Sequence, residues 1–258
     1  MLYPKAPKGK DLGMKKYVLW MVVFLYIALP WSAHAAIEKL QYQNATNSLR
    51  IDILQNDLIH VTYQKGPVVH PSIPMRPTPF VEKNDFAGPT SFQELQNGFQ
   101  TKALKVVVYT QSLCIRIYDL EQNNNLTKVC PKGLGQAIQG LHLDPVGLTH
   151  AYGLGQELVS PGLINGDWLV HKKRTPGEMG NQMVPFEQAA VGNTQIPILY
   201  GLGQGNKAFG LYLDNVYKQK WYFSPKLWRV VVYGQDQLSF YVMTGPNLQD
   251  LRKDYMAL

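Results

Sequence analysis

Four carboxylates lie in the glycine-rich middle of the sequence, at Glu157, Asp167, Glu178 and Glu187. Enzymes that hydrolyse glycosidic bonds use two carboxyl groups, about 5–5.5 Å apart when they retain the anomeric configuration and about 6.5–9.5 Å apart when they invert it. The spacing of these four residues along the chain fixes no such distance. We therefore weigh an acid–base pair against a simpler interpretation, in which all four are solvated acids on loops.

Three histidines occur in the same region, His142, His150 and His171. Together with Glu157 they supply the side-chain types of an acid–base set such as a sugar epimerase uses. A general base must first lie within hydrogen-bond reach of the proton that it takes, and scattered loop positions do not ensure this. We expect surface polar residues here and keep the epimerase as an alternative.

Aromatic side chains offer flat apolar faces on which sugar rings stack. Trp168 stands in a predicted loop, INGDWLV, beside Asp and Asn, and is a candidate sugar-binding residue. A second group, Trp221, Tyr222, Phe223 and Trp228, lies in a strand-like segment. The strand pattern favours a place in the core or on a sheet face for this second group.

The two cysteines, Cys114 and Cys130, flank the polar stretch EQNNN. An antiparallel hairpin that turns there places them opposite each other, which predicts a cross-strand disulfide, with two buried thiols as the alternative. Such a bridge closes a short loop and contributes about 3 kcal/mol in an oxidising compartment. Two cysteines do not make a closed zinc site.

Several other chemistries have no support in the sequence. It contains no phosphate loop of the form G-x-x-x-x-G-K-[ST], no G-x-S-x-G nucleophile elbow and no H-E-x-x-H metal motif. We expect neither a metal nor an organic cofactor.

The amino-terminal segment has the layout of a secretory signal peptide. Fifteen uncharged residues, 17–31, follow Lys15 and Lys16, and Ala33-His34-Ala35 supplies an A-x-A site, which predicts cleavage after Ala35. A spanning helix needs about 20 apolar residues, so a retained anchor is the less favoured alternative. Met14 is an alternative start. We expect an exported protein, periplasmic or secreted.

Composition indicates a chain of short strands joined by turns. Of 258 residues, 45% are hydrophobic and 17% charged, and there are 22 Gly, 17 Pro and 15 Tyr, which excludes disorder and argues against a helix bundle. The net charge is +7, but five lysines and one aspartate give +4 within the first 35 residues. The remaining +3 gives no indication of nucleic-acid binding.

Alternating apolar residues mark the elements. LRIDILQNDLIHVTY predicts a hairpin with Leu49, Ile51 and Ile53 on one face of its first strand and Ile59, Val61 and Tyr63 on its second. Residues 64–98 are rich in proline and predict a long surface excursion. Further strands are predicted in ALKVVVYT, SLCIRIYDL, FGLYLDN, QKWYFS, LWRVVVYG and LSFYVMTG. No internal repeat occurs. Asn247 caps a final helix with an apolar stripe at Leu248, Leu251, Tyr255 and Leu258.

Four motifs in this order resemble glycoside hydrolase family 31: YGLGQ (152–156), GNTQIPILY (192–200), FGLYLDN (209–215) and FYVMTGPNLQDLRKDYMAL (240–258). The resemblance implies an all-β fold, an antiparallel β-sandwich of the galactose-mutarotase-like type with a short C-terminal linker helix. It divides the chain into an extension and signal peptide (1–35), a sandwich (36–246) and the start of a helix leading to a catalytic barrel that is absent here (247–258).

The resemblance also implies a function. The family hydrolyses terminal α-glycosidic bonds, and both of its catalytic aspartates belong to the barrel, so no catalytic residue can be assigned in this chain. The sandwich contributes a loop to the active-site rim, at positions matching Gly192, Asn193, Thr194 and Gln195. Expected partners are an α-linked oligosaccharide and a catalytic barrel, separately encoded if the chain is a split enzyme. A stand-alone carbohydrate-binding module and an aldose epimerase are the alternatives.

Overall fold

The chain falls into two units, Met1–His34 and Ala35–Leu258, and the described residues all belong to the second. The computed structural model describes residues 36–66, 81–83, 85–133, 139–155, 177–179, 196–215, 217, 219–234 and 237–258, with the backbone alone for 177–179. The predicted signal peptide lies outside these residues. None of the helices found within them is long and apolar enough to cross a membrane.

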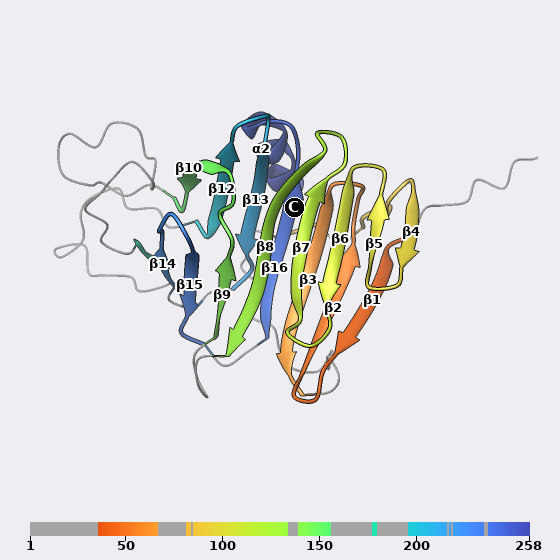
Figure 1. The fold of residues 1–258 in the computed structure, drawn as a ribbon, viewed down its shortest axis with the longest axis horizontal. Helices are drawn as coiled ribbons and strands as arrows, with labels where there is room; N and C mark the ends of the chain where they lie inside the picture. Colours follow the sequence, from red (N-terminus) through yellow and green to blue (C-terminus); the bar gives the residue numbers. More distant parts are fainter. Residues whose placement is uncertain are drawn as a thin grey trace, which may run out of the picture. The chain divides into compact units, whose positions relative to one another are not determined.

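The unit is an all-β sandwich of two antiparallel sheets, as the sequence predicts (Figure 1). The seven-stranded sheet has the order β1 (Glu38–Gln43), β2 (Asn47–Ile53), β3 (Leu58–Lys65), β16 (Leu238–Thr244), β13 (Ala208–Leu213), β12 (Ile198–Gly203) and β10 (Leu148–Gly153). The nine-stranded sheet has the order β11 (Gly177–Met179), β14 (Gln219–Tyr222), β15 (Trp228–Val232), β9 (Gln139–Leu143), β8 (Asn124–Gly133), β7 (Cys114–Asp119), β6 (Leu104–Tyr109), β5 (Gly98–Thr101) and β4 (Phe92–Leu95).

The main core lies between the two sheets and follows from the period-2 alternation of their strands. The predicted hairpin is confirmed: β2 pairs with β3, and Leu49, Ile51 and Ile53 lie opposite Tyr63, Val61 and Ile59. All six enter the core. Trp221 and Trp228 are also fully buried there, so the core placement predicted for them is confirmed.

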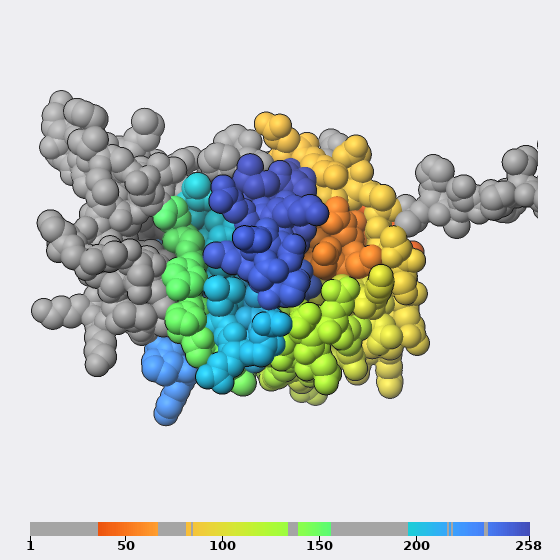
Figure 2. All heavy atoms as spheres, turned by 90° about the horizontal axis from the view of Figure 1, so that it is seen from above, coloured from red at the N-terminus to blue at the C-terminus, as the bar shows by residue number. Residues whose placement is uncertain are grey.

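A second apolar cluster lies under helix α2 (Leu248–Met256), on the outer face of the seven-stranded sheet. Asn247 is the N-cap, as predicted, and its side chain accepts hydrogen bonds from the backbone N–H groups of Gln249 and Asp250. In Figure 2 the blue C-terminal segment lies between the cyan spheres of β12 and β13 and the orange N-terminal strands. The helix contacts β12, β13 and β16.

The end of the helix is tied to a distant part of the chain. The backbone carbonyl of Leu258 accepts hydrogen bonds from the N–H groups of Glu82 and Lys83, at 2.9 and 2.7 Å. Leu251 and Leu258 of the predicted stripe are buried, whereas Leu248 at its start is 37% exposed.

The segment 64–98, for which a long surface excursion is predicted, carries regular strands at both of its ends. Strand β3 continues to Lys65, and β4 with β5 forms a hairpin that begins at Phe92. The prolines that motivated the prediction all precede this hairpin, since the last of them is Pro89. Residues 67–80 and 84 lie outside the described residues.

Candidate functional site

The predicted sugar-binding residues Asn193, Thr194, Gln195 and Trp168 lie outside the described residues. The same holds for Glu157, Asp167 and Glu187, and Glu178 lies in β11, where only the backbone is described. The structure does place the strand that the predicted rim segment enters, which is β12.

Strand β12 is fixed at its entry by backbone hydrogen bonds. The carbonyl of Pro197 accepts from the N–H of Leu213, and the carbonyl of Ile198 accepts from the N–H of Leu154. Gly153, in the motif YGLGQ, has a φ of 107°, and a Cβ there would collide with the Ile198 carbonyl. The motifs YGLGQ and IPILY are therefore neighbours in space, and the glycine permits their close approach.

Tyr200 links this strand to helix α2. It belongs to the apolar cluster beneath the helix, together with Tyr212 and Tyr255. Burial raises the pKa of Tyr200 to about 12, with a further contribution from Tyr255. The phenol therefore stays neutral at physiological pH and acts as a packing group.

The two described histidines of the hypothetical epimerase set do not come together. His142 lies on β9 of the nine-stranded sheet, between the inward-facing Leu141 and Leu143, and so points away from the core. His150 lies on β10 of the other sheet, next to the inward-facing Ala151. The core of the sandwich separates them. His171 and Glu157 lie outside the described residues.

The two cysteines form a disulfide, Cys114–Cys130, between β7 and β8. Their Cα atoms are 4.2 Å apart. No free cysteine remains in the chain.

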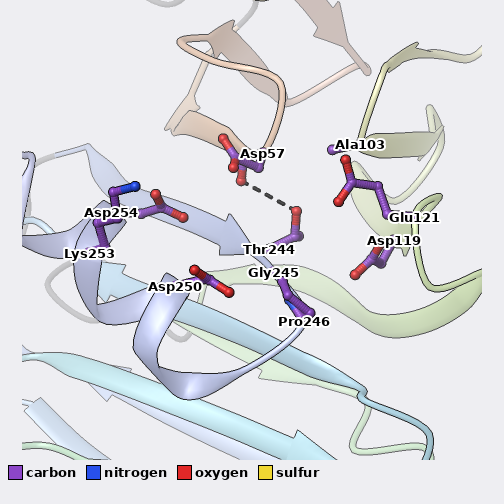
Figure 3. A pocket seen from close by; sticks show the side chains of 10 residues that line it. All are labelled: Asp57, Ala103, Asp119, Glu121, Thr244, Gly245, Pro246, Asp250, Lys253 and Asp254. Carbon is purple, nitrogen blue, oxygen red and sulfur yellow. Dashed lines mark hydrogen bonds between the residues drawn. The ribbon is translucent and has the colours of Figure 1, made fainter.

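A pocket of about 280 Å³ lies where helix α2 meets the turns at one end of the sandwich (Figure 3). Its lining comes from four places: the β2–β3 turn, the β5–β6 turn, the end of β7 with the turn after it, and the segment from the end of β16 into α2. Five carboxylates and one lysine are among the lining residues: Asp57, Asp119, Glu121, Asp250, Asp254 and Lys253.

Hydrogen bonds hold several of these groups in place. The Asp57 backbone carbonyl accepts from the Thr244 N–H at 2.9 Å, which joins the turn to the end of β16. Asp119 is almost fully buried, and its Oδ1 accepts from the Gln122 N–H at 3.0 Å. Asp250 Oδ2 accepts from the Asn247 side-chain amide at 2.7 Å.

Burial and the proximity of other carboxylates raise the pKa values of two acids in this pocket, Asp254 and Asp57. Burial, with the charges of Asp57 and Asp250, raises the pKa of Asp254 to about 7, and Lys253 opposes this only in part. Burial also raises the pKa of Asp57, and Glu121 and Asp250 add to the effect. Asp254 can therefore take up or release a proton near neutral pH, a property found at functional sites and also in structural clusters.

Sequence reasoning missed this pocket. Its acids come from separate turns and from helix α2, and no motif connects them in the sequence. The available signal was that Asp57, Asp119 and Glu121 lie in or beside two predicted hairpin turns. Among the described side chains, no three His, Cys, Asp or Glu residues are arranged to hold a metal ion.

No family model matches the sequence. No curated protein matches it either.

Solved structures do match the fold. A glycoside hydrolase family 31 dextranase from Flavobacterium johnsoniae, complexed with isomaltotriose, matches 86% of this chain and 27% of its own, with 15% identity and a TM-score of 0.61. A family 31 α-xylosidase from a soil metagenome, complexed with xylose, matches 86% of this chain and 33% of its own, with 13% identity and a TM-score of 0.56.

A cycloalternan-forming enzyme from Listeria monocytogenes, in complex with a pentasaccharide substrate, matches 87% of this chain and 22% of its own, with 11% identity and a TM-score of 0.56. This chain thus spans between 22% and 33% of the length of these three proteins. At such low identity the likeness concerns the fold. The chain therefore folds as a β-sandwich like one part of glycoside hydrolase family 31 enzymes.

Proposed function

We propose that this chain is the sandwich portion of an exported α-glycosidase of the glycoside hydrolase family 31 type. In this proposal the sandwich is of the galactose-mutarotase-like type and supplies part of the rim of a sugar site. The observation that carries the proposal is the match of 86% of this chain to 27% of a family 31 dextranase. Export would follow cleavage after Ala35.

The rim role rests on the geometry at the start of β12. Pro197 and Ile198 are anchored by backbone hydrogen bonds to β13 and to the end of β10, respectively. Asn193, Thr194 and Gln195 precede this anchored strand entry in the sequence, and their amide and hydroxyl groups are proposed to hydrogen-bond the sugar. Trp168 is proposed as the stacking platform.

The reaction proposed for the complete enzyme is hydrolysis of terminal α-glycosidic bonds with retention. This reaction needs a carboxylate nucleophile and a second carboxyl group about 5–5.5 Å from it. The resemblance assigns both to a catalytic barrel, on the same polypeptide or a separate one. The present chain alone should leave p-nitrophenyl α-glucoside and α-xyloside intact.

Sugar binding tests the rim role directly. Isothermal titration of the full chain with isomaltotriose, glucose and xylose should give weak binding. An N193A/W168A double variant should weaken it at least about tenfold, because a stacking face and a hydrogen-bonding amide are both lost. Asn97→Ala, in the exposed β4–β5 turn, is the matched control and should bind as the parent does.

Three results would count against this proposal. Absence of heat with all three sugars, in a protein that unfolds cooperatively, would remove the sugar-binding role. Acceleration of glucose anomerisation above the buffer rate, abolished by His150→Gln, would favour an epimerase instead. Binding without a barrel partner in the host, judged by peptide mapping of the native product, would favour a stand-alone carbohydrate-binding module.

A further inference from the structure

The outer face of the nine-stranded sheet is strongly basic. Its strands direct alternate side chains away from the core, and six of these outward positions carry a cation, while the positions beside them in each strand are buried and mostly apolar. We call this set the basic face; its cations are Lys105, Arg116, Lys128, Lys132, Lys220 and Arg229.

Few carboxylates accompany these cations. Among the described outward side chains the carboxylate is Asp144, whose Oδ2 lies 3.9 Å from an Arg116 nitrogen. The strand register also places Glu178 of β11 opposite Lys220 of β14. The described carboxylates gather elsewhere, notably in the pocket under helix α2. The chain beyond residue 35 has 20 Lys and Arg and 17 Asp and Glu, a net charge of +3, and six of the 20 cations lie on this one sheet face.

Tyrosines hold several of these cations against the sheet. Lys128 Nζ lies 4.4 Å from the centre of the Tyr109 ring, and Arg116 Nε donates to Tyr109 Oη at 3.3 Å. Arg229 Cζ lies 4.3 Å from the centre of the Tyr222 ring. A long side chain that already rests on an aromatic ring loses less conformational freedom when it binds a ligand.

The strand register shows how these groups are spaced. Arg116 lies opposite Lys128 on β7 and β8, and Arg229 lies opposite His142 on β15 and β9. Strands β8 and β15 flank β9, and both Cys130 and Arg229 lie opposite His142. Lys128 and Arg229 therefore stand two strand spacings apart across the sheet and two residues apart along it, a Cα separation of about 12 Å.

His142 lies on β9, between the strands that carry Lys128 and Arg229, and its pKa is affected by burial and by nearby positive charges. Burial lowers the pKa of His142, and the positive charges of Lys132 and Arg229 lower it further. The imidazole is therefore neutral at physiological pH and can donate or accept a hydrogen bond between the cations.

We propose that the basic face binds an anionic polysaccharide, a glycan chain that carries carboxylate or sulfate groups. By strand geometry the Cα atoms of Arg116 and Lys128 lie about 5 Å apart and those of Lys128 and Arg229 about 12 Å apart, intervals that suit a linear polymer with charges on successive or alternate sugars. The hydroxyl groups of Tyr109 and Tyr222 and the imidazole of His142 add hydrogen-bonding partners that suit sugar hydroxyls.

This proposal is independent of the proposed rim. The rim segment enters β12 of the seven-stranded sheet, and the basic face belongs to the other sheet. Changes on the basic face should therefore leave the binding of isomaltotriose unchanged, and changes at Asn193 should leave the binding of anionic polymer unchanged. The failure of one proposal can be told from the failure of the other.

The test is affinity electrophoresis of the full chain through gels that contain polygalacturonate, dextran sulfate or neutral dextran. The two anionic polymers should retard the protein at 50 mM NaCl and much less at 300 mM, because exposed charges are screened by salt. Neutral dextran should cause far less retardation. A K128Q/R229Q double variant should raise the dissociation constants for the anionic polymers roughly five- to tenfold.

The control is K39Q/R252Q, which removes the same charge from exposed positions on β1 and α2. It should bind anionic polymer as the parent does. Equal weakening in both double variants would overturn the proposal, since net charge alone would then explain binding. So would the absence of retardation by both anionic polymers at 50 mM NaCl, or tighter binding of a single-stranded oligothymidylate than of polygalacturonate.

Discussion

Asp254 shows how a single carboxyl group makes the stability of this protein depend on pH. Its pKa is about 7 in the folded chain, because of burial and the charges of Asp57 and Asp250, against about 3.9 in an unfolded one. The folded state therefore binds the proton more tightly. This contribution to stability is complete below about pH 4 and is lost as the pH rises to about 7.

The substitution Asp254→Asn should accordingly raise the free energy of unfolding by about 1–2 kcal/mol at pH 8 and change it little at pH 4. This range is well below the full value of the pKa shift, because the side chain is partly solvated and the repulsion is screened. Urea denaturation of both proteins at the two pH values measures the difference. Glu38→Gln, at an exposed position on β1, should show no such pH dependence. Equal stability of the parent and Asp254→Asn at pH 8 would contradict the prediction.

The pKa of Asp52 is shifted in the opposite direction, so its effect on the pH dependence of stability is also opposite. Burial alone would raise its pKa, but hydrogen bonds from His60 and Arg50, and their charges, hold the pKa below its usual value. Its Oδ1 lies 2.9 Å from Arg50 Nε, and His60 Nε2 lies 2.7 Å from Ser239 Oγ. The stability that this network supplies is present above about pH 4 and is lost as the pH falls through the folded-state pKa.

Replacing Asp52 by Asn removes the acceptor charge and leaves Arg50 and His60 partly buried without it. We expect a loss of about 1.5–3 kcal/mol at pH 7, the usual range for hydrogen bonds to charged groups. Guanidinium denaturation measures the loss. Asp85→Asn, an exposed change outside this network, serves as the comparison and should cost less than about 0.5 kcal/mol.

At the scale of elements, Leu251 makes the most deeply buried contact of helix α2. It is fully buried against the outer face of the seven-stranded sheet, in the cluster that includes Tyr212 and Met243. Leu251→Ala leaves a cavity under the helix and should lower the free energy of unfolding by about 2–4 kcal/mol. Met256→Ala, 71% exposed on the same helix, is the control. Similar small losses from both would mean that the helix is not held by this contact.

The β7–β8 hairpin carries the disulfide Cys114–Cys130, which joins positions 16 residues apart. Closing a loop of this size restricts the unfolded chain and stabilises the fold by about 3 kcal/mol. The double change C114A/C130A should lower the free energy of unfolding by about 3 kcal/mol, and the urea midpoint should fall accordingly. Dithiothreitol should shift the parent to the same midpoint and leave the double variant unaffected; a parent midpoint insensitive to dithiothreitol would contradict the prediction.

Sequence patterns predict elements well where one face of the element is buried. The β2–β3 hairpin, the strands β6, β7 and β13–β16, and helix α2 with its cap at Asn247 were predictable from alternation, helical periodicity and capping chemistry. Strands β1, β9 and β10 were not, because β1 is a largely polar edge strand and β9 and β10 contain glycine among mixed side chains.

The surface sites depend on contacts between distant segments, which periodicity does not encode. The acidic pocket needs Asp57 and Asp254 to meet, although 197 positions separate them in the numbering. The basic face needs β8 and β15 to share β9 as a neighbour. A single sequence supplies the charges but not the strand order that gathers them.

At the scale of the whole molecule, strand order determines how the sandwich should unfold. In the seven-stranded sheet β3 pairs with β16, far apart in the sequence, and the strands between them are divided between the two sheets. Neither sheet is one continuous stretch of chain, and both contribute to the same core. Neither sheet can therefore lose its structure while the other keeps a covered apolar face.

We expect a single cooperative transition in spite of the size of the unit. Far-ultraviolet circular dichroism, which follows the strands, and tryptophan fluorescence, which follows the buried Trp221 and Trp228, should give the same urea midpoint and slope. Phe240→Ala, in the core on β16, should shift both curves together by about 3–5 kcal/mol. Two separated transitions would mean that part of the structure unfolds independently. The interleaved order of the strands in the two sheets would then not govern stability.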